Sequence, residues 1–165
     1  MPEHSEENEL IRLSLNGDRR AQFRLYRKYV RAMYHTIIRM VGNPHDAEDL
    51  TQELFAKVFK NLDSFKGEST LGAWIKRIAI NTALNFLRSK GNMRFVETTE
   101  SLDLASFPEN DSETTDFDVK RIHEAIKKLP EGCRVVFNLY LPEGYQHKEI
   151  AEILGISEST SKTQY

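Results

Sequence analysis

The feature that most constrains the fold of this chain is its long stretches with helical spacing. They contain few glycines or prolines, and apolar residues recur in them every three or four positions. In residues 18–41 this spacing runs from Phe23 through Val30 to Ile38. Residues 44–62 and 70–89 show similar helical spacing, and the period-two alternation of a half-buried strand is absent from them. The pattern predicts an all-α fold class.

Capping residues place the ends of these helices. Asp18 is suited to cap the first helix and Gly42 to end it, while Asn43 can cap the second with Pro44 at its first position. Helical character returns later in the chain and is interrupted at Pro130 and again at residues 142–144. The predicted helices span residues 18–41, 44–62, 70–89, 117–129, 131–141, 146–154 and 157 onward.

Charge is distributed unevenly along the chain, and this distribution predicts its domains. The whole chain has a net charge of −2, but residues 1–92 carry +4, residues 93–117 carry −6 and residues 118–165 are balanced. The middle block is rich in Ser, Thr, Asp and Glu and lacks apolar periodicity, as is typical of a linker. We therefore predict two small helical domains, 1–92 and 118–165, joined by an acidic flexible linker, 93–117.

Several functional classes are disfavoured by composition. No apolar run approaches the ~20 residues that a membrane-spanning helix needs, and the acidic amino terminus does not resemble a signal peptide, so we expect a cytoplasmic protein without membrane insertion. The single cysteine, Cys133, is expected to be a small buried residue. The five histidines have no paired-ligand spacing and no glycine-rich phosphate loop is present. We expect no metal, no cofactor and no enzymatic activity.

Residues 146–165 have the spacing of a helix-turn-helix. Gly155 permits a left-handed turn, Ile156 fills the angle between two helices, and Ser157 can cap the second one. Such a unit places its second helix in the major groove of DNA, although a helical hairpin without nucleic acid is the alternative. Ser161 departs from the pattern, because an apolar residue would anchor this helix better. The candidate DNA contacts are Ser157, Glu158, Ser159, Thr160, Lys162 and Thr163.

The helix over residues 70–89 carries two distinct faces when each residue is advanced by about 100°. The expected core face comprises Leu71, Ile75, Ile78, Thr82 and Phe86. A second stripe, roughly 80° wide, combines an aromatic ring, two amides and two guanidinium groups, which are the groups that hold exposed bases and phosphates of single strands. A solvated face with its tryptophan in the core is the alternative. The stripe consists of Trp74, Arg77, Asn81, Asn85 and Arg88.

The outer side of the helix over residues 44–62 is acidic and polar. It presents Glu48, Asp49, Gln52 and Glu53. Carboxylates cannot face phosphate, so this side is a candidate docking surface for a basic protein, and a plain solvated face explains it about equally well.

Two long runs resemble one protein family. Residues 46–88, DAEDLTQELFAKVFKNLDSFKGESTLGAWIKRIAINTALNFLR, are similar to region 2 of the extracytoplasmic-function group of bacterial sigma-70 factors. Residues 129–162, LPEGCRVVFNLYLPEGYQHKEIAEILGISESTSK, are similar to their region 4. The resemblance implies a transcription initiation factor that binds core RNA polymerase, directs it to promoters and assists DNA melting.

Residue roles follow from the same resemblance. It implies that Asp49, Gln52 and Glu53 dock on the polymerase clamp helices, and that Ser157, Thr160 and Lys162 contact duplex DNA at the minus-thirty-five element. A loop is implied to hold a base flipped from the melted non-template strand, and it comprises Phe65, Lys66, Gly67, Glu68 and Ser69. Residues implied to read and melt the minus-ten element are Lys76, Arg77, Asn81, Asn85 and Arg88.

Further expectations concern the linker and the carboxyl end. In the family the linker enters the RNA exit path of polymerase, where a net charge of −6 can imitate RNA. Many members are held inactive by an anti-sigma factor, and this sequence does not identify one. The recognition helix has barely two turns before Tyr165, so we expect weak minus-thirty-five binding by residues 118–165.

Two other functions compete with this one. A stand-alone helix-turn-helix regulator would bind duplex DNA without polymerase, but it would leave the acidic side and the stripe unexplained. A helical phosphotransfer protein would use an exposed histidine such as His35 or His123, but neither lies in a distinctive motif.

Overall fold

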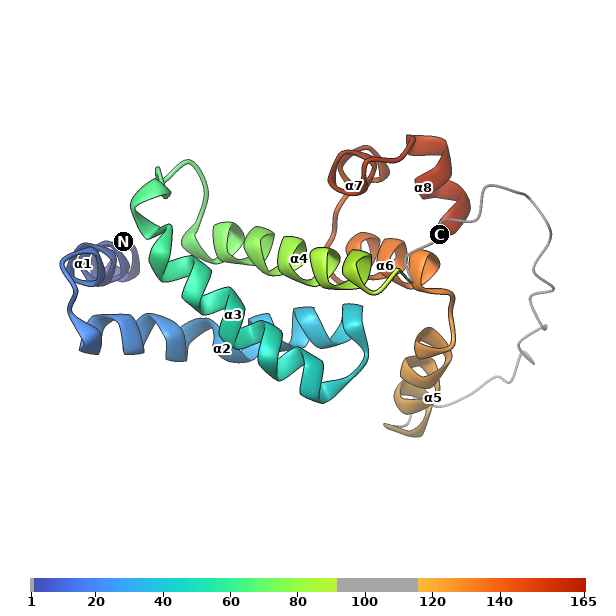
Figure 1. The fold of residues 1–165 in the computed structure, drawn as a ribbon, viewed down its shortest axis with the longest axis horizontal. Coiled ribbons are helices and arrows are strands. Elements are labelled where there is room, and N and C mark those ends of the chain that lie inside the picture. The colour runs from blue at the N-terminus through green and yellow to red at the C-terminus, as the bar shows by residue number, and fades with distance from the viewer. Residues whose placement is uncertain (1, 92–115) are drawn as a thin grey trace. The chain divides into compact units, whose positions relative to one another are not determined.

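The computed structural model describes residues 2–91 and 116–165, and all of the regular structure in these ranges is helical (Figure 1). This confirms the predicted fold class. Residues 92–115, which include most of the proposed acidic linker, lie outside the described residues. The helices are α1 (Pro2–Leu15), α2 (Arg19–Val41), α3 (Pro44–Lys60), the 3-10 turn η1 (Leu62–Ser64), α4 (Leu71–Ser89), α5 (Asp116–Lys127), α6 (Glu131–Tyr140), α7 (His147–Leu154) and α8 (Glu158–Gln164).

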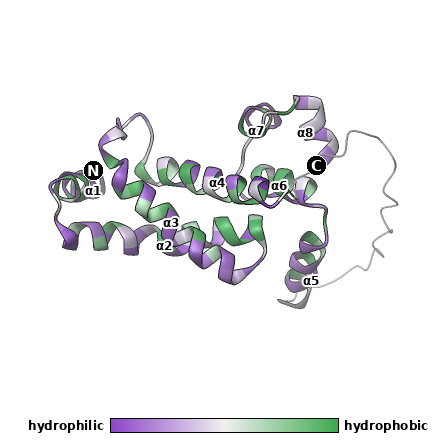
Figure 2. Cartoon of the chain, viewed as in Figure 1, coloured by the Kyte–Doolittle hydropathy of each residue, from purple (hydrophilic) through white to green (hydrophobic). Residues whose placement is uncertain are grey.

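The chain divides into two compact units, Met1–Lys90 and Gly91–Tyr165. In the first unit α2, α3 and α4 pack against one another, and α1 folds back onto α2. Figure 2 shows hydrophobic and hydrophilic residues interspersed along these helices, as expected for helices with one buried face. The largest fully buried side chains of this unit are Ile37, Met40, Leu54, Leu62, Leu71, Ile75, Ile80, Leu84 and Leu87.

The connection from α2 to α3 forms as the capping residues predict. Gly42 ends α2 with a φ of 80° in the left-handed region. The Asn43 side chain then accepts hydrogen bonds from the backbone N–H groups of His45, at 2.9 Å, and Asp46, at 3.1 Å. Pro44 occupies the first turn of α3, where a missing N–H costs nothing.

The buried face of α4 is wider than the sequence predicts. Ile78 and Phe86, expected in the core, are only half-buried. The buried arc instead extends around the helix, because α4 contacts both α2 and α3 and not a single neighbour. The buried residues that were not predicted are Ala79, Ile80, Ala83, Leu84 and Leu87.

Helix α1 was not predicted, because its sequence is acidic and its apolar stripe is short. Among the α1 side chains from residue 4 onward, Leu10 is the one buried apolar residue. The helix is held to α2 by ion pairs of Glu6 with Arg24 and of Glu7 with Lys28, and Glu7 also accepts a 2.6 Å hydrogen bond from the Tyr29 hydroxyl. These partners lie 18 to 22 residues away in the chain, which places them beyond any local pattern.

Glu7 makes the attachment of α1 sensitive to pH. Burial raises the pKa of Glu7, but the hydrogen bonds from Lys28 and Tyr29 outweigh it, so the net pKa lies below the ordinary value of 4.5. A depressed carboxyl pKa contributes stability above the unfolded pKa and loses it as pH falls through the folded one. We expect α1 amides to lose hydrogen-exchange protection below about pH 4.5. In Glu7→Gln that acid-dependent loss should be absent.

The second unit has a core of its own. Val135, Val136, Leu139 and Ile150 are fully buried there. Cys133 is a free, buried cysteine, as predicted, and its thiol donates a 3.3 Å hydrogen bond to Gln164 Oε1. Burial raises the pKa of this thiol, which keeps it protonated and unreactive.

The part of the chain that the structure describes contains no helix with the length and apolar character to cross a membrane. Within residues 2–91 and 116–165, no group of three or more His, Cys, Asp or Glu side chains is arranged to hold a metal ion.

Candidate nucleic-acid interface

The stripe on α4 forms a continuous exposed surface. Thr70 caps the helix by accepting a 3.2 Å hydrogen bond from the Ala73 N–H, and the helix then runs unbroken to Ser89. Arg77 and Arg88 are separated by eleven residues, or about 16 Å along the axis, which matches about five stacked nucleotides. The exposed members are Arg77, Asn81, Asn85 and Arg88.

Lys76 lies apart from the stripe. Its side chain is half-buried, because the helical period turns it toward the packed side of α4, whereas Arg77 is exposed. The structure therefore groups four of the five residues assigned to the minus-ten element and separates the fifth.

The loop before α4 is joined to the stripe through two aromatic rings. Phe65 packs against Trp74 with a centroid separation of 5.4 Å and an interplanar angle of 50°. Both rings are half-buried, so Trp74 is neither a core residue nor a free exposed one. Gly67 has a φ of 75°, which disfavours any residue with a side chain there. Lys66, Glu68 and Ser69 are exposed beside it.

The polar side of α3 is solvent-accessible as predicted, and its carboxylates pair within their own helix. Asp49 lies 3.9 Å from His45, and Glu53 lies 2.9 Å from Lys57. Ion pairs between exposed side chains contribute little stability and exchange readily with other partners. Asp49, Gln52 and Glu53 therefore form a surface that an incoming cation can reach, which we call the α3 patch.

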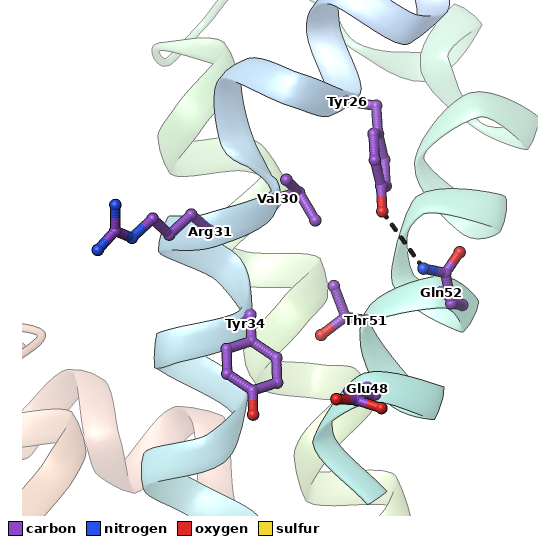
Figure 3. Close-up of a pocket in the computed structure, with 7 residues that line it drawn as sticks. All are labelled: Tyr26, Val30, Arg31, Tyr34, Glu48, Thr51 and Gln52. Carbon is purple, nitrogen blue, oxygen red and sulfur yellow. Dashed lines mark hydrogen bonds between the residues drawn. The ribbon is translucent and has the colours of Figure 1, made fainter. Parts of the chain in front are cut away.

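A groove between α2 and α3 borders this patch (Figure 3). It has a volume of about 290 Å³, and Gln52 Nε2 donates a 3.3 Å hydrogen bond to the Tyr26 hydroxyl at its rim. The sequence places Tyr26 and Tyr34 among the apolar positions of α2 and gives no signal for a groove there. The lining residues are Tyr26, Val30, Arg31, Tyr34, Glu48, Thr51 and Gln52.

Helices α7 and α8 form the predicted helix-turn-helix. Gly155 ends α7 with a φ of 68°, and Ser157 caps α8 by accepting a 3.1 Å hydrogen bond from the Thr160 N–H. The hydroxyls of Ser157 and Thr160 lie 2.7 Å apart, so both are engaged in the cap.

Two further candidate contacts on α8 are also engaged locally. Lys162 pairs with Glu158 at 3.3 Å, and the Thr163 hydroxyl donates a 2.9 Å hydrogen bond to the carbonyl of Ser159. Glu158, Ser159, Lys162 and Thr163 are exposed nevertheless. DNA binding by these side chains therefore requires exchange of short-range bonds on an exposed helix, and each such exchange costs little.

Ser161 occupies the position where an apolar residue would be expected, and the structure shows how a hydroxyl is accommodated there. The side chain is fully buried and lies 2.9 Å from His147 Nδ1. Tyr140 stacks on the His147 ring at 4.5 Å, and Tyr165 meets its edge at 5.7 Å. His147 thus links α6, α7 and α8, a role that its sequence surroundings do not indicate.

This link leads to a stability prediction. Ser161→Ala removes the partner of a part-buried ring nitrogen, so we expect the second unit to lose about 1–2 kcal/mol of unfolding free energy. Hydrogen exchange of α7 and α8 amides in the full chain measures this loss. Ser159→Ala, an exposed change on the same helix, should shift stability by less than about 0.5 kcal/mol. Equal protection in the two variants would contradict the prediction.

A helix-turn-helix is a common motif of helical DNA-binding proteins, and comparison with known proteins makes the class specific. Residues 25–93 match the family model of sigma-70 region 2, and residues 120–165 match that of sigma-70 region 4. The ECF RNA polymerase sigma factor SigW of Bacillus subtilis is 31% identical over 159 residues, covering 90% of this chain and 84% of that protein.

Other known proteins agree with this assignment. The RNA polymerase sigma-H factor of Pseudomonas aeruginosa is 29% identical over 170 residues, covering 96% of this chain and 88% of that protein. The solved structure of CnrH in complex with the cytosolic domain of CnrY has a similar fold, with a TM-score of 0.55 at 21% identity, over 96% of this chain and 88% of that one. This chain belongs to the extracytoplasmic-function group of the sigma-70 family and is a transcription initiation factor.

Proposed function

We propose that this sigma factor binds core RNA polymerase through the α3 patch and opens promoters with the α4 stripe and the loop Phe65–Ser69. In the same proposal, α8 reads duplex DNA at the minus-thirty-five element. The packing of Phe65 on Trp74 is the observation that best supports the proposal. It joins the loop and the stripe into one surface with two aromatic rings between them.

Charge and accessibility support polymerase binding through the α3 patch. Asp49 and Glu53 are exposed, and each lies beside a side chain one helical turn away, His45 and Lys57 respectively. A basic partner surface can replace those weak pairs, and complementary charges of this kind set the association rate and register of a complex. The resemblance to region 2 assigns the same residues to polymerase.

The chemistry of the stripe supports a role in promoter opening. A base that leaves the duplex loses its stacking and pairing, and the enzyme or factor that captures it must replace both. Aromatic rings supply stacking, amides such as Asn81 and Asn85 match base edges, and guanidinium groups such as Arg88 meet phosphate. The exposed loop beside Trp74 supplies a place for the flipped base.

The remaining partners and properties rest on the family resemblance. We propose an anti-sigma factor as a regulator, a cytoplasmic location, and no catalysis by this chain, since RNA synthesis belongs to the polymerase. The proposed RNA mimicry of the linker concerns residues outside the described ranges. We assign residues 1–92 to region 2 and residues 118–165 to region 4.

Run-off transcription tests the function directly. Purified chain is mixed with core polymerase and genomic DNA fragments, and defined transcripts are expected only when both proteins are present. A parallel assay measures binding of the chain alone to the promoters so found. Specific duplex binding without polymerase, together with no transcripts, would support a stand-alone regulator instead.

A further inference from the structure

We propose that α1 is a positioning element for the loop Phe65–Ser69, and that Glu7 and Tyr29 transmit its effect. The inference rests on the proposed role of that loop in holding an unpaired base. It goes beyond that role because it assigns a function to a helix outside the residues that match sigma-70 region 2.

Helix α1 supports the loop where the loop begins. It contacts η1, the turn Leu62–Ser64 that leads directly into Phe65 (Figure 1). The η1 turn is itself anchored, because Leu62 is buried and the Phe65 N–H donates a 3.1 Å hydrogen bond to the Leu62 carbonyl. A shift of α1 therefore acts on the segment that sets the direction of the Phe65 ring.

The same helix supports the loop where the loop ends, through Tyr29. The Glu7 carboxylate accepts a 2.6 Å hydrogen bond from the Tyr29 hydroxyl. The Tyr29 ring in turn lies against the first turn of α4, so closely that a Cβ on Gly72 would be 3.1 Å from Tyr29 Cε1. Gly72 is the second residue after Thr70, which caps α4 at the end of the loop.

The contacts that link α1, Tyr29 and the first turn of α4 are close. Leu10 is buried beside the polar contacts of α1, and the Tyr29 ring has only a hydrogen atom of Gly72 between it and the α4 backbone. Packed contacts of this kind move together, because a gap of even half an ångström forfeits much of the van der Waals attraction. The ends of the loop are thus both fixed to one helix, while its middle stays exposed.

The chain offers an internal probe for this effect. Trp74 is the single tryptophan, and its ring lies against Phe65. Its fluorescence therefore reports the position of the loop relative to α4. Glu7→Gln and Tyr29→Phe each weaken the hydrogen bond between α1 and Tyr29, and Gly72→Ala crowds the Tyr29 ring from the α4 side. For each we expect increased quenching of Trp74 by acrylamide. Glu9→Gln is the matched control, because Glu9 is exposed on the same helix and pairs with Arg12 of that helix.

Function is measured on two templates with reconstituted holoenzyme. On a duplex promoter we expect Glu7→Gln and Tyr29→Phe to slow open-complex formation about three- to tenfold relative to Glu9→Gln, as loss of one hydrogen bond of ~1 kcal/mol allows. On a template already unpaired around the minus-ten element, that difference should shrink to less than twofold. A variant that is merely unstable would be equally impaired on both templates.

The outcomes separate this inference from the function on which it rests. If the unaltered chain gives no promoter opening, the proposed function fails, and Trp74 quenching still decides whether α1 positions the loop. If the chain opens promoters but the Glu7 and Tyr29 variants match Glu9→Gln in both quenching and opening, the positioning role is wrong. Altered quenching with unaltered duplex opening overturns the link between loop position and melting.

Discussion

Replacing Asn81 and Arg88 together by alanine is expected to reduce open-complex formation on a duplex promoter by at least a hundredfold. The two side chains are exposed on α4. In the proposed function the Asn81 amide meets a base edge and the Arg88 guanidinium meets a phosphate. Each such contact is worth about 1.5–3 kcal/mol when a charged or bidentate group is involved, and each 1.36 kcal/mol of lost stabilisation is a factor of ten in rate. Permanganate reactivity of unpaired thymines measures the effect directly.

The design of this experiment separates melting from folding and from assembly. Because both residues are exposed, their removal should change stability by less than about 0.5 kcal/mol each. Polymerase affinity should be unchanged, since neither residue lies on the α3 patch. Asn16→Ala with Arg27→Ala removes the same pair of chemical groups from exposed positions outside α1 and α4. Normal thymine reactivity in the Asn81 and Arg88 double variant would refute the proposed role of the stripe.

The second large effect concerns the α3 patch. Asp49→Lys combined with Glu53→Lys is expected to weaken binding to core polymerase by about a hundredfold or more. Charge reversal removes two attractive contacts and also places the new lysines opposite the basic surface proposed for the partner. Like charges that face each other cost several kcal/mol at an interface. The pairs with His45 and Lys57 that are lost inside α3 are exposed and contribute little.

Binding of fluorescently labelled chain to core polymerase, followed by anisotropy at low and moderate salt, measures this loss. Glu9→Lys with Glu152→Lys makes an equal change in net charge at exposed positions outside the patch. The control should bind within about threefold of the unaltered chain, because surface charges far from an interface are screened over a Debye length of about 8 Å at physiological salt. Equal weakening in both double variants would show a nonspecific charge effect.

Parts of the fold that depend on neighbouring residues could be predicted closely. The Asn43 cap, the Gly42 stop and the Gly155 turn are each formed by bonds or backbone angles within three residues, and all three appear as expected. The charge of α3 and the stripe on α4 are similarly readable, because a helix repeats every 3.6 residues. Periodicity also predicts the exposure of Asn81 and Arg88 from position alone.

Features that depend on packing could not be read in this way. The width of the buried face of α4 depends on how many helices cover it. Two helices, α2 and α3, contact α4. Trp74 carries no local signal for its half-buried state, which depends on Phe65 nine residues earlier. Lys76, by contrast, lies off the stripe as the helical period predicts, so here the periodicity and not the family resemblance gave its direction.

The sequence by itself determined the ends of α2 and α4, the class of fold and the family, because these follow from short-range bonds, periodicity and ordered runs of residues. The tertiary structure decided which polar groups became partners. Glu7 with Tyr29 and His147 with Ser161 are separated by 22 and 14 residues, and only packing brings them together. The physical reason is that a buried polar group needs a partner in space, and no periodic rule along one helix specifies which residue of another will supply it.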